Sequence, residues 1–376
     1  MKDNRATKGF SLKDQLFNVD KIRYLSGLFE AADADFDGAQ FQKSVMAQLP
    51  ALELKARISM IAEVLEQHLS PDFEIAAAQI LAALPAELDP GKTDDDFGDF
   101  IMAPLGVFVS NNGLEYLETS LALLREMTKR FSVEFDIRYF LNAHPVATMD
   151  ALKQWAKDPN YHVRRLVSEG TRPTLPWGKK IGIAVHEPLG FLDDLHHDKA
   201  RFVTRSVANH LNDIAKKDPE LVVATLKRWA KLGKQTPEEL DWITRHALRT
   251  LVKKGDIAAL ELLGYRAKPE ISVSEIQGPT VLEIGAVGVF ELAITAVQDE
   301  KLMIDYVVDF IKKNGSSRPR VFKLKKLDIK AGETVNLSKS HRFLKDATTF
   351  THYPGAHRMW LQINGQKFGL CEFELR

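Results

Sequence analysis

A repeat of about 40 residues in the first two thirds of the sequence limits the possible folds more than any other feature. Residues 163–167 (VRRLV) align at this offset with residues 203–207 (VTRSV), which align in turn with residues 243–247 (ITRHA). A period of this length is typical of HEAT-like helical pairs, which stack into a curved solenoid with one concave face. The sequence therefore predicts such a solenoid, with a chance similarity of three helices as the alternative.

Helix-start signals precede each copy of the repeat. The same offset relates Asp158, Asp198 and Glu238, each of which lies five residues before its motif. Pro159 follows Asp158, and proline is favoured at the first position of a helix. We therefore expect a helix to begin at each acidic residue, with Asp158 as the cap of the first.

The first of these helices has two different faces. One stripe of small and apolar residues at helical spacing is expected to be buried: Val163, Leu166, Val167 and Gly170. Four polar residues fall within about 80° of one another on the adjoining face, at 100° per residue: His162, Arg165, Glu169 and Arg172. An acid on an otherwise basic face repels phosphate, so we expect Glu169 to meet a cation.

The pattern of apolar residues changes after about residue 267. Apolar residues then alternate, as at Phe290, Leu292 and Ile294, and Asn364-Gly365 supplies a two-residue hairpin turn. About seven short strands fit into this part, which is typical of an immunoglobulin-like β-sandwich. We therefore predict a mostly α chain with two domains, a HEAT-like domain over residues 1–267 and an immunoglobulin-like domain over residues 268–376.

The charge balance limits the nature of the partner. The 376 residues include 51 basic and 51 acidic ones, so a polyanion must be bound by a local basic surface rather than by net charge. The single cysteine, Cys371, excludes an internal disulfide framework. The sequence has no run of 18 apolar residues and no apolar leader, so we expect a cytoplasmic monomer that binds no membrane.

Two acidic segments match metal sites only in part. Residues 33–38 (DADFDG) match the start of a calcium-binding loop, but Ser44 stands where that loop needs a bidentate glutamate. The segment at residues 193–198 (DDLHHD) is better explained as the loop before a helix. We expect no bound metal and no cofactor.

Arginines recur with the repeat, and two explanations of them are open. Equivalent helices in a stack point the same way, so Arg165, Arg205 and Arg245 are expected to form a line at a spacing of ~10 Å. Guanidinium groups in a row suit the phosphates of a nucleic acid, although an arginine can equally bond the neighbouring repeat. The candidate contacts to a DNA backbone are Arg164, Arg172, Lys179, Lys180, Arg205, Arg245 and Arg249. A basic run in the second domain, residues 316–326 (SSRPRVFKLKK), is either another such contact or a solvated hairpin.

Two long strings resemble a known family. Residues 160–178 (NYHVRRLVSEGTRPTLPWG) and residues 203–222 (VTRSVANHLNDIAKKDPELV) are similar to the AlkC branch of the AlkC/AlkD DNA alkylation-repair glycosylases, and the resemblance covers nearly the whole chain. It implies monofunctional excision of 3-methylcytosine, 1-methyladenine and 3-methyladenine from double-stranded DNA. It also implies Glu134 and Glu169 as the catalytic carboxylates, with Phe135, Trp177 and Arg165 around the lesion. His162 is a further candidate for the same cleft.

The chemistry of such a reaction agrees with these residues. An N-alkylated base of this kind is a cation, so cleavage needs no proton donor, and positive charge develops on the deoxyribose instead. A fixed carboxylate stabilises that charge and positions water. The alternative for Glu134 is an acid favoured by the helix dipole two residues after a Ser132 cap. The alternative for the whole chain is a scaffold that binds nucleic acid or protein without catalysis.

Overall fold

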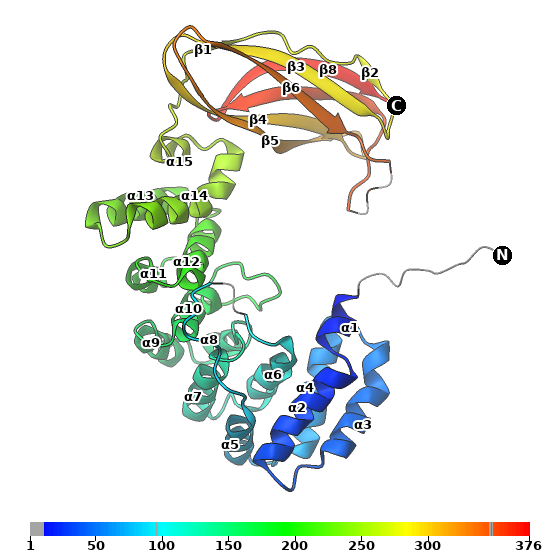
Figure 1. Cartoon of the computed structure of the whole chain (residues 1–376), viewed down its shortest axis with the longest axis vertical. Coiled ribbons are helices and arrows are strands. Elements are labelled where there is room, and N and C mark those ends of the chain that lie inside the picture. The colour runs from blue at the N-terminus through cyan, green and yellow to red at the C-terminus, as the bar shows by residue number, and fades with distance from the viewer. Residues whose placement is uncertain (1–10, 95–96, 346, 348) are drawn as a thin grey trace, which may run out of the picture. The chain divides into compact units, whose positions relative to one another are not determined.

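Helices occupy the chain as far as Leu262, and strands occupy it from Ile271 (Figure 1). The computed structural model describes residues 11–94, 97–345, 347 and 349–376. The predicted fold, mostly helical with a C-terminal β-sandwich, is therefore confirmed. The boundary between residues 267 and 268 stays a prediction. No helix of the described residues is long and apolar enough to span a membrane.

The described chain divides into two compact units. One consists of residues up to Ile214 together with Gly233–Ile243, and the other of Ala215–Leu232 together with Thr244–Arg376. The helices of the first unit are α1 (Leu12–Leu16), α2 (Val19–Ala32), α3 (Gly38–Gln48), η1 (Leu49–Ala51), α4 (Leu54–His68), α5 (Phe73–Ala83), η2 (Phe100–Met102), α6 (Ala103–Asn112), α7 (Leu117–Thr128), α8 (Ile137–Ala143), α9 (Pro145–Trp155), α10 (Tyr161–Gly170), α11 (Leu189–Leu195) and α12 (Arg201–Ile214). Helices α13 (Pro219–Leu232) and α15 (Ile257–Leu262) belong to the second unit, and α14 (Pro237–Lys254) contributes to both.

A buried arginine fastens α1 to α4. The Arg57 guanidinium donates to the backbone carbonyls of Leu52, Lys13 and Phe17 at 2.9–3.0 Å, and to the Asp14 carboxylate at 2.7 Å. Its side chain is 2% exposed. The Lys13 carbonyl also accepts from the Phe17 amide at 3.0 Å. Arg57 therefore joins α4 to the C-terminal end of α1.

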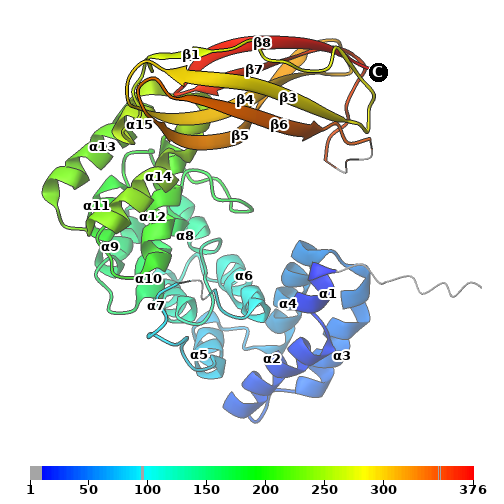
Figure 2. The same ribbon diagram turned by 45° about the horizontal axis from the view of Figure 1, so that its top comes forward.

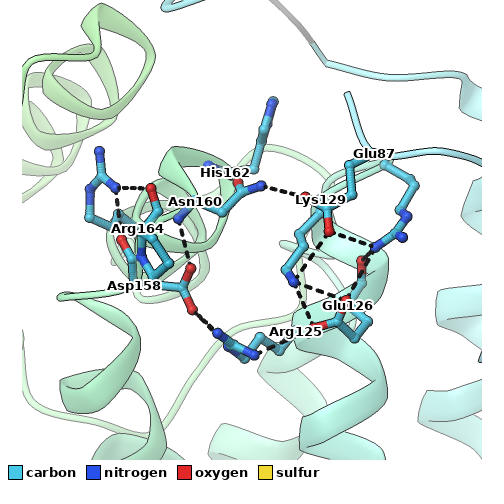
Figure 3. Close-up of polar contacts among 10 residues, drawn as sticks. Glu87, Arg125, Glu126, Lys129, Asp158, Asn160, His162 and Arg164 are labelled. Atoms are coloured by element: carbon cyan, nitrogen blue, oxygen red, sulfur yellow. Dashed lines mark hydrogen bonds and ion pairs between the residues drawn. The ribbon is translucent and has the colours of Figure 1, made fainter. Parts of the chain in front are cut away.

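Arginine–carboxylate pairs join successive repeats. Arg125 of α7 donates to Asp158, Arg164 of α10 donates to Asp198 at 2.9 Å, and Arg201 of α12 donates to Glu239 of α14. In each pair the acid lies 33 to 38 residues after the arginine. Figure 3 shows the first pair, with Arg125 directed at Asp158 below the start of α10. Arg164 therefore bonds the neighbouring repeat, and the predicted line of Arg165, Arg205 and Arg245 stays a prediction.

The predicted cap of α10 is wrong. The helix begins at Tyr161, and its cap is Asn160, whose side-chain oxygen accepts from the His162 amide at 2.9 Å. Asp158 instead accepts from the Asn160 amide at 2.8 Å and from Arg125 (Figure 3). In this repeat Asp158 thus serves the contact between repeats, and Asn160 caps the helix.

The C-terminal strands form two sheets around an apolar core. The strands are β1 (Ile271–Val273), β2 (Val281–Leu282), β3 (Val287–Ala296), β4 (Glu300–Ile311), β5 (Ser317–Ile329), β6 (Thr334–Arg342), β7 (Gly355–Ile363) and β8 (Gln366–Leu375). The sheet orders are β1-β3-β6 and β2-β8-β7-β4-β5 (Figure 2). Phe290, Ile294 and Leu361 lie in the core between them. Asn364 and Gly365 make the predicted β7–β8 turn, with φ values of 46° and 79°.

Candidate active site

The two predicted carboxylates reach one buried cluster from different helices. Glu134 lies in the turn before α8, and Glu169 lies in the last turn of α10. Gly170 allows these elements to meet, because a Cβ atom at residue 170 would lie 2.6 Å from Cγ2 of Ile137 on α8. Pro145 begins α9 and keeps α8 short. The end of α10 thus lies against the start of α8, beside both acids.

Arg165 lies between these two acids. Its guanidinium donates to Oε2 of Glu134 and, at 2.6 Å, to Oγ of Ser132, and lies 3.6 Å from Oε1 of Glu169. Ser132 in turn donates to Glu134 at 2.9 Å. The Arg165 group also lies 4.7 Å from the centre of the Phe202 ring and 5.6 Å from that of Phe97. Arg165 is therefore fixed by two charges and two aromatic faces.

A second arginine holds Glu169 from the other side. Arg172 donates to Oε1 of Glu169 at 2.5 Å and to Asp213 of α12 at 2.9 Å, and Ser206 donates to Oε2 of Glu169 at 2.6 Å. Burial alone would raise the pKa of Glu169, but the charges of Arg165 and Arg172 and the Ser206 hydrogen bond outweigh it and hold that pKa below its ordinary value. Glu169 is therefore a buried, ionised carboxylate.

The ion-paired groups do not balance. We call Glu134, Arg165, Glu169, Arg172 and Asp213 the carboxylate cluster; each is at most 8% exposed. With all five groups ionised, its three acids and two arginines leave one net negative charge. The buried Arg138 guanidinium of α8 acts electrostatically on Glu134, Glu169 and Asp213 and compensates that charge. The carboxylates of the cluster are therefore held in place by cations of the chain itself.

A loop after α10 carries Trp177. We call residues 171–180 the Trp177 loop. Trp177 has φ = 68°, in the left-handed region that a bulky residue rarely adopts, and its side chain is 58% exposed. Such a conformation costs about 1–3 kcal/mol and persists only where the surroundings impose it. Nζ of Lys55 lies 5.5 Å from the centre of the indole ring.

Two parts of the chain match family models, and nearly the whole chain is similar to two known proteins. Residues 124–251 match the family model described as DNA alkylation repair enzyme, and residues 272–376 match that of the YhaZ C-terminal Ig-like domain. The Bacillus subtilis protein YhaZ is 32% identical over 366 residues, which cover 96% of this chain and 98% of YhaZ. The alkylpurine DNA glycosylase AlkC of Pseudomonas fluorescens, solved with DNA containing an abasic site analog, superposes with a TM-score of 0.84 at 32% identity, over 98% of this chain and all of AlkC.

The chain belongs to the AlkC family of DNA alkylation-repair enzymes. The region that matches the repair-enzyme model includes Glu134, Glu169 and Trp177. The carboxylate cluster therefore lies wholly within the part of the chain that defines the family.

The other residues predicted near the lesion differ in exposure. His162 is buried, and its ring lies 4.0 Å from that of Tyr161 and 5.6 Å from that of Phe202, centre to centre. Phe135, next to Glu134, is partly exposed. The face of α10 predicted to be a polar surface is itself buried, because α12 covers it and supplies Ser206 and Asp213. Glu169 meets cations there, as predicted, but they are the chain's own arginines.

The predicted backbone-binding cations fall into three groups in this AlkC relative. The side chains of Arg164 and Arg172 bind carboxylates of the same unit and are largely buried. Arg205 is partly exposed and pairs with Asp94. Lys179, Lys180, Arg245 and Arg249 are exposed, the last two on the part of α14 that belongs to the second unit. The predicted line of arginines stays a prediction, and Arg165 itself is buried in the carboxylate cluster.

Sequence reasoning missed three polar partners in the cluster. Ser132 does not cap α8, since α8 begins at Ile137 after Asp136; it bonds Glu134 and Arg165 instead. Ser206 and Asp213 were not considered. Together with His210, they are polar residues of α12 at positions i, i+4 and i+7, so a buried polar face was visible in the sequence.

A neighbouring carboxyl group gives the protein a predicted pH dependence. Burial raises the pKa of Asp136 from 3.8 to about 7, against a hydrogen bond from Ser110. Between these two values the folded chain binds more protons than the unfolded chain. The free energy of unfolding therefore falls as the pH rises from about 4 to about 7, by up to about 4 kcal/mol for this group.

Asp136→Asn removes this titration. We expect the variant to be more stable than the parent at pH 8 and to lose the advantage at pH 5, as measured by urea unfolding at both values. Equal stability of the two proteins at pH 8 would show that Asp136 is not buried as described.

Proposed function

We propose that the chain is a monofunctional DNA glycosylase that hydrolyses the N-glycosidic bond of cationic alkylated bases in double-stranded DNA. The substrates are 3-methylcytosine, 1-methyladenine and 3-methyladenine, and the enzyme acts as a cytoplasmic monomer without metal or cofactor. The observation that carries this proposal is the buried carboxylate cluster, in which arginines hold Glu134 and Glu169 in fixed positions.

The cluster fits the charge that base loss creates. As the bond from C1′ to the base nitrogen breaks, the electron pair leaves with the base, which becomes neutral, and the positive charge moves to the sugar. Carboxylates fixed by arginines stabilise this charge without reorganisation. Water then adds to C1′ and loses a proton to solvent, so an abasic site remains and no covalent lysine intermediate is needed. The abasic-site DNA in the AlkC structure is the same class of product.

Trp177 and Phe135 are suited to the bases around the lesion. Stacking of a base on an aromatic side chain contributes about 1–3 kcal/mol, and a cationic base adds a cation–π attraction. The exposure of the Trp177 indole and its fixed backbone support this role.

A release assay tests the proposal directly. The full chain is incubated with a duplex that contains one 3-methylcytosine, and the free base is measured by chromatography, with parallel duplexes for the other two lesions. Release of base supports the glycosylase. Tight binding with no release from any lesion would favour the non-catalytic scaffold.

The salt dependence of DNA binding separates exposed from internally paired cations. We propose Lys180 as a phosphate contact because its side chain is exposed next to Trp177. Lys180→Ala should weaken binding to any duplex sequence and lower the slope of log affinity against log salt by about 1. Arg164→Ala is the control, because its guanidinium is bonded to Asp198. If the slope of log affinity against log salt is the same in Lys180→Ala as in the parent protein, Lys180 is not a phosphate contact.

The basic residues of β5 are a further proposed contact. This strand lies at the edge of its sheet, and residues 317–320 at its start are exposed. Positive charge on an edge strand suits a DNA backbone and also prevents edge-to-edge pairing.

A further inference from the structure

A buried arginine of α8 makes no ion pair in the part of the chain that the structure describes. Arg138 is 1% exposed, and its guanidinium donates only to backbone carbonyls: to Lys179 at 2.5 Å, to Gly170 at 2.7 Å and to Arg172 at 3.0 Å. Burial lowers the pKa of Arg138 to about 10, so the group still carries its charge at neutral pH. A buried charged group that donates to backbone carbonyls alone is unusual, because burying the charge is costly.

The three carbonyls lie on both sides of Trp177. Gly170 and Arg172 precede the indole, and Lys179 follows it, so Arg138 closes the base of the Trp177 loop. Asn142, one turn further along α8, holds the next residues: its amide donates to the Lys180 carbonyl at 2.9 Å and accepts from the Gly182 amide at 3.0 Å. One face of α8 therefore binds both ends of the loop.

The same contacts explain how Trp177 keeps its conformation. Its left-handed backbone is unfavourable for a side chain of this size, and its indole is too exposed for burial to impose the strain. With both ends of the loop fixed, few backbone conformations connect them. The conformational entropy of the loop is therefore lost when the protein folds and not when DNA binds.

Arg138 also connects the loop to the carboxylate cluster. It binds the carbonyl of Arg172, whose side chain holds Glu169 and Asp213. We propose that Arg138 is a positioning residue, which closes the Trp177 loop so that the indole and the Arg172–Glu169 pair stand in a fixed relation before the lesion binds. The expected effect of Arg138 on catalysis rests on the proposed function, whereas its expected effect on the loop in the free protein does not.

The free protein gives the first test. In Arg138→Lys, which keeps the charge but not the three bonds, amide hydrogen exchange in residues 171–182 should accelerate by at least about tenfold. Arg57→Lys is the matched control, because Arg57 is similarly buried and also donates to three carbonyls, at the end of α1 and just before α4. It should accelerate exchange there and leave the Trp177 loop unchanged. Unchanged loop exchange in Arg138→Lys, with the protein folded by circular dichroism, would overturn the proposal.

A double-mutant cycle gives the second test. Arg138→Lys should lower the excision rate by about tenfold to a hundredfold, since small displacements of positioned groups have effects of this size. Trp177→Ala should remove most of this sensitivity, so that Arg138→Lys adds less than about threefold in that background. Independent, additive effects would contradict a role through Trp177.

The cycle also has a form that does not need catalysis. If the parent protein releases no base, the proposed function fails, and the same four proteins are compared by their affinity for a duplex with an abasic site. Coupling of Arg138 and Trp177 in binding would still support Arg138 as the residue that closes the Trp177 loop, and additive losses of affinity would overturn this role. If Arg138→Lys does not fold, Asn142→Ala replaces it in both tests, with a smaller expected acceleration near residues 180–182.

Discussion

Glu169→Gln should reduce the single-turnover rate of base excision by at least about 100-fold and leave DNA affinity equal or higher. The substitution keeps the shape of the side chain and removes its charge, which is the charge we propose to stabilise the sugar cation. Loss of one preorganised electrostatic group of this kind costs about 10²- to 10³-fold in rate. Arg165 and Arg172 keep their charge, so the site becomes less repulsive to phosphate.

Glu239→Gln is the matched control for this variant. Glu239 is also a carboxylate bonded to an arginine and a hydroxyl, Arg201 and Thr204, but it joins two repeats. It should lower the thermal midpoint and leave excision within about twofold, since its partners Arg201 and Thr204 lie outside the carboxylate cluster. If Glu169→Gln excises at the parent rate, Glu169 is not a catalytic residue.

Glu134→Gln should lower excision by about 100-fold as well, for a partly different reason. The change removes one carboxylate of the pair and frees Arg165 from its strongest partner, while Ser132 still binds the guanidinium. Arg165 can then turn towards a phosphate, so we expect duplex affinity, measured by fluorescence anisotropy, to rise. Glu126→Gln is the control, because Glu126 pairs with Lys129 of its own segment (Figure 3) and with Arg130. A rate equal to that of the control would exclude Glu134 from the chemistry.

The periodic parts of the fold could be predicted from the sequence. The 40-residue repeat relates α10 and α12, which pack against each other, and alternation together with Asn364-Gly365 predicts the β7–β8 hairpin. These signals are local and regular, since each follows from the period of a helix or strand and from the φ > 0 that such a turn requires. Exact helix ends could be predicted less well. Asp158 and Asn160 are both good caps, and only the contact of Asp158 with Arg125 decides between them.

The candidate site could be predicted only in part from the sequence. Glu134 and Glu169 were found through the resemblance to a family, and the structure brings them together around Arg165. A helical pattern distinguishes polar from apolar faces, but it does not tell a solvated polar face from one buried against another polar face. For the same reason Arg165 was expected on a surface and lies inside. No feature of the sequence predicted the positive φ of Trp177, since neither its own residue type nor its neighbours favour such a value.

Within α10, the repeat contact and the proposed chemistry use neighbouring residues. The pairs Arg125–Asp158, Arg164–Asp198 and Arg201–Glu239 hold successive repeats together. Arg165 and Glu169 lie on the same helix as Arg164 and contact Glu134 and Ser206 of the neighbouring segments. Substitutions at 165 or 169 leave the three repeat pairs in place. A repeat scaffold arranged in this way can acquire a new activity in one copy while its siblings keep the architecture, which is a route by which a stack of helices becomes an enzyme.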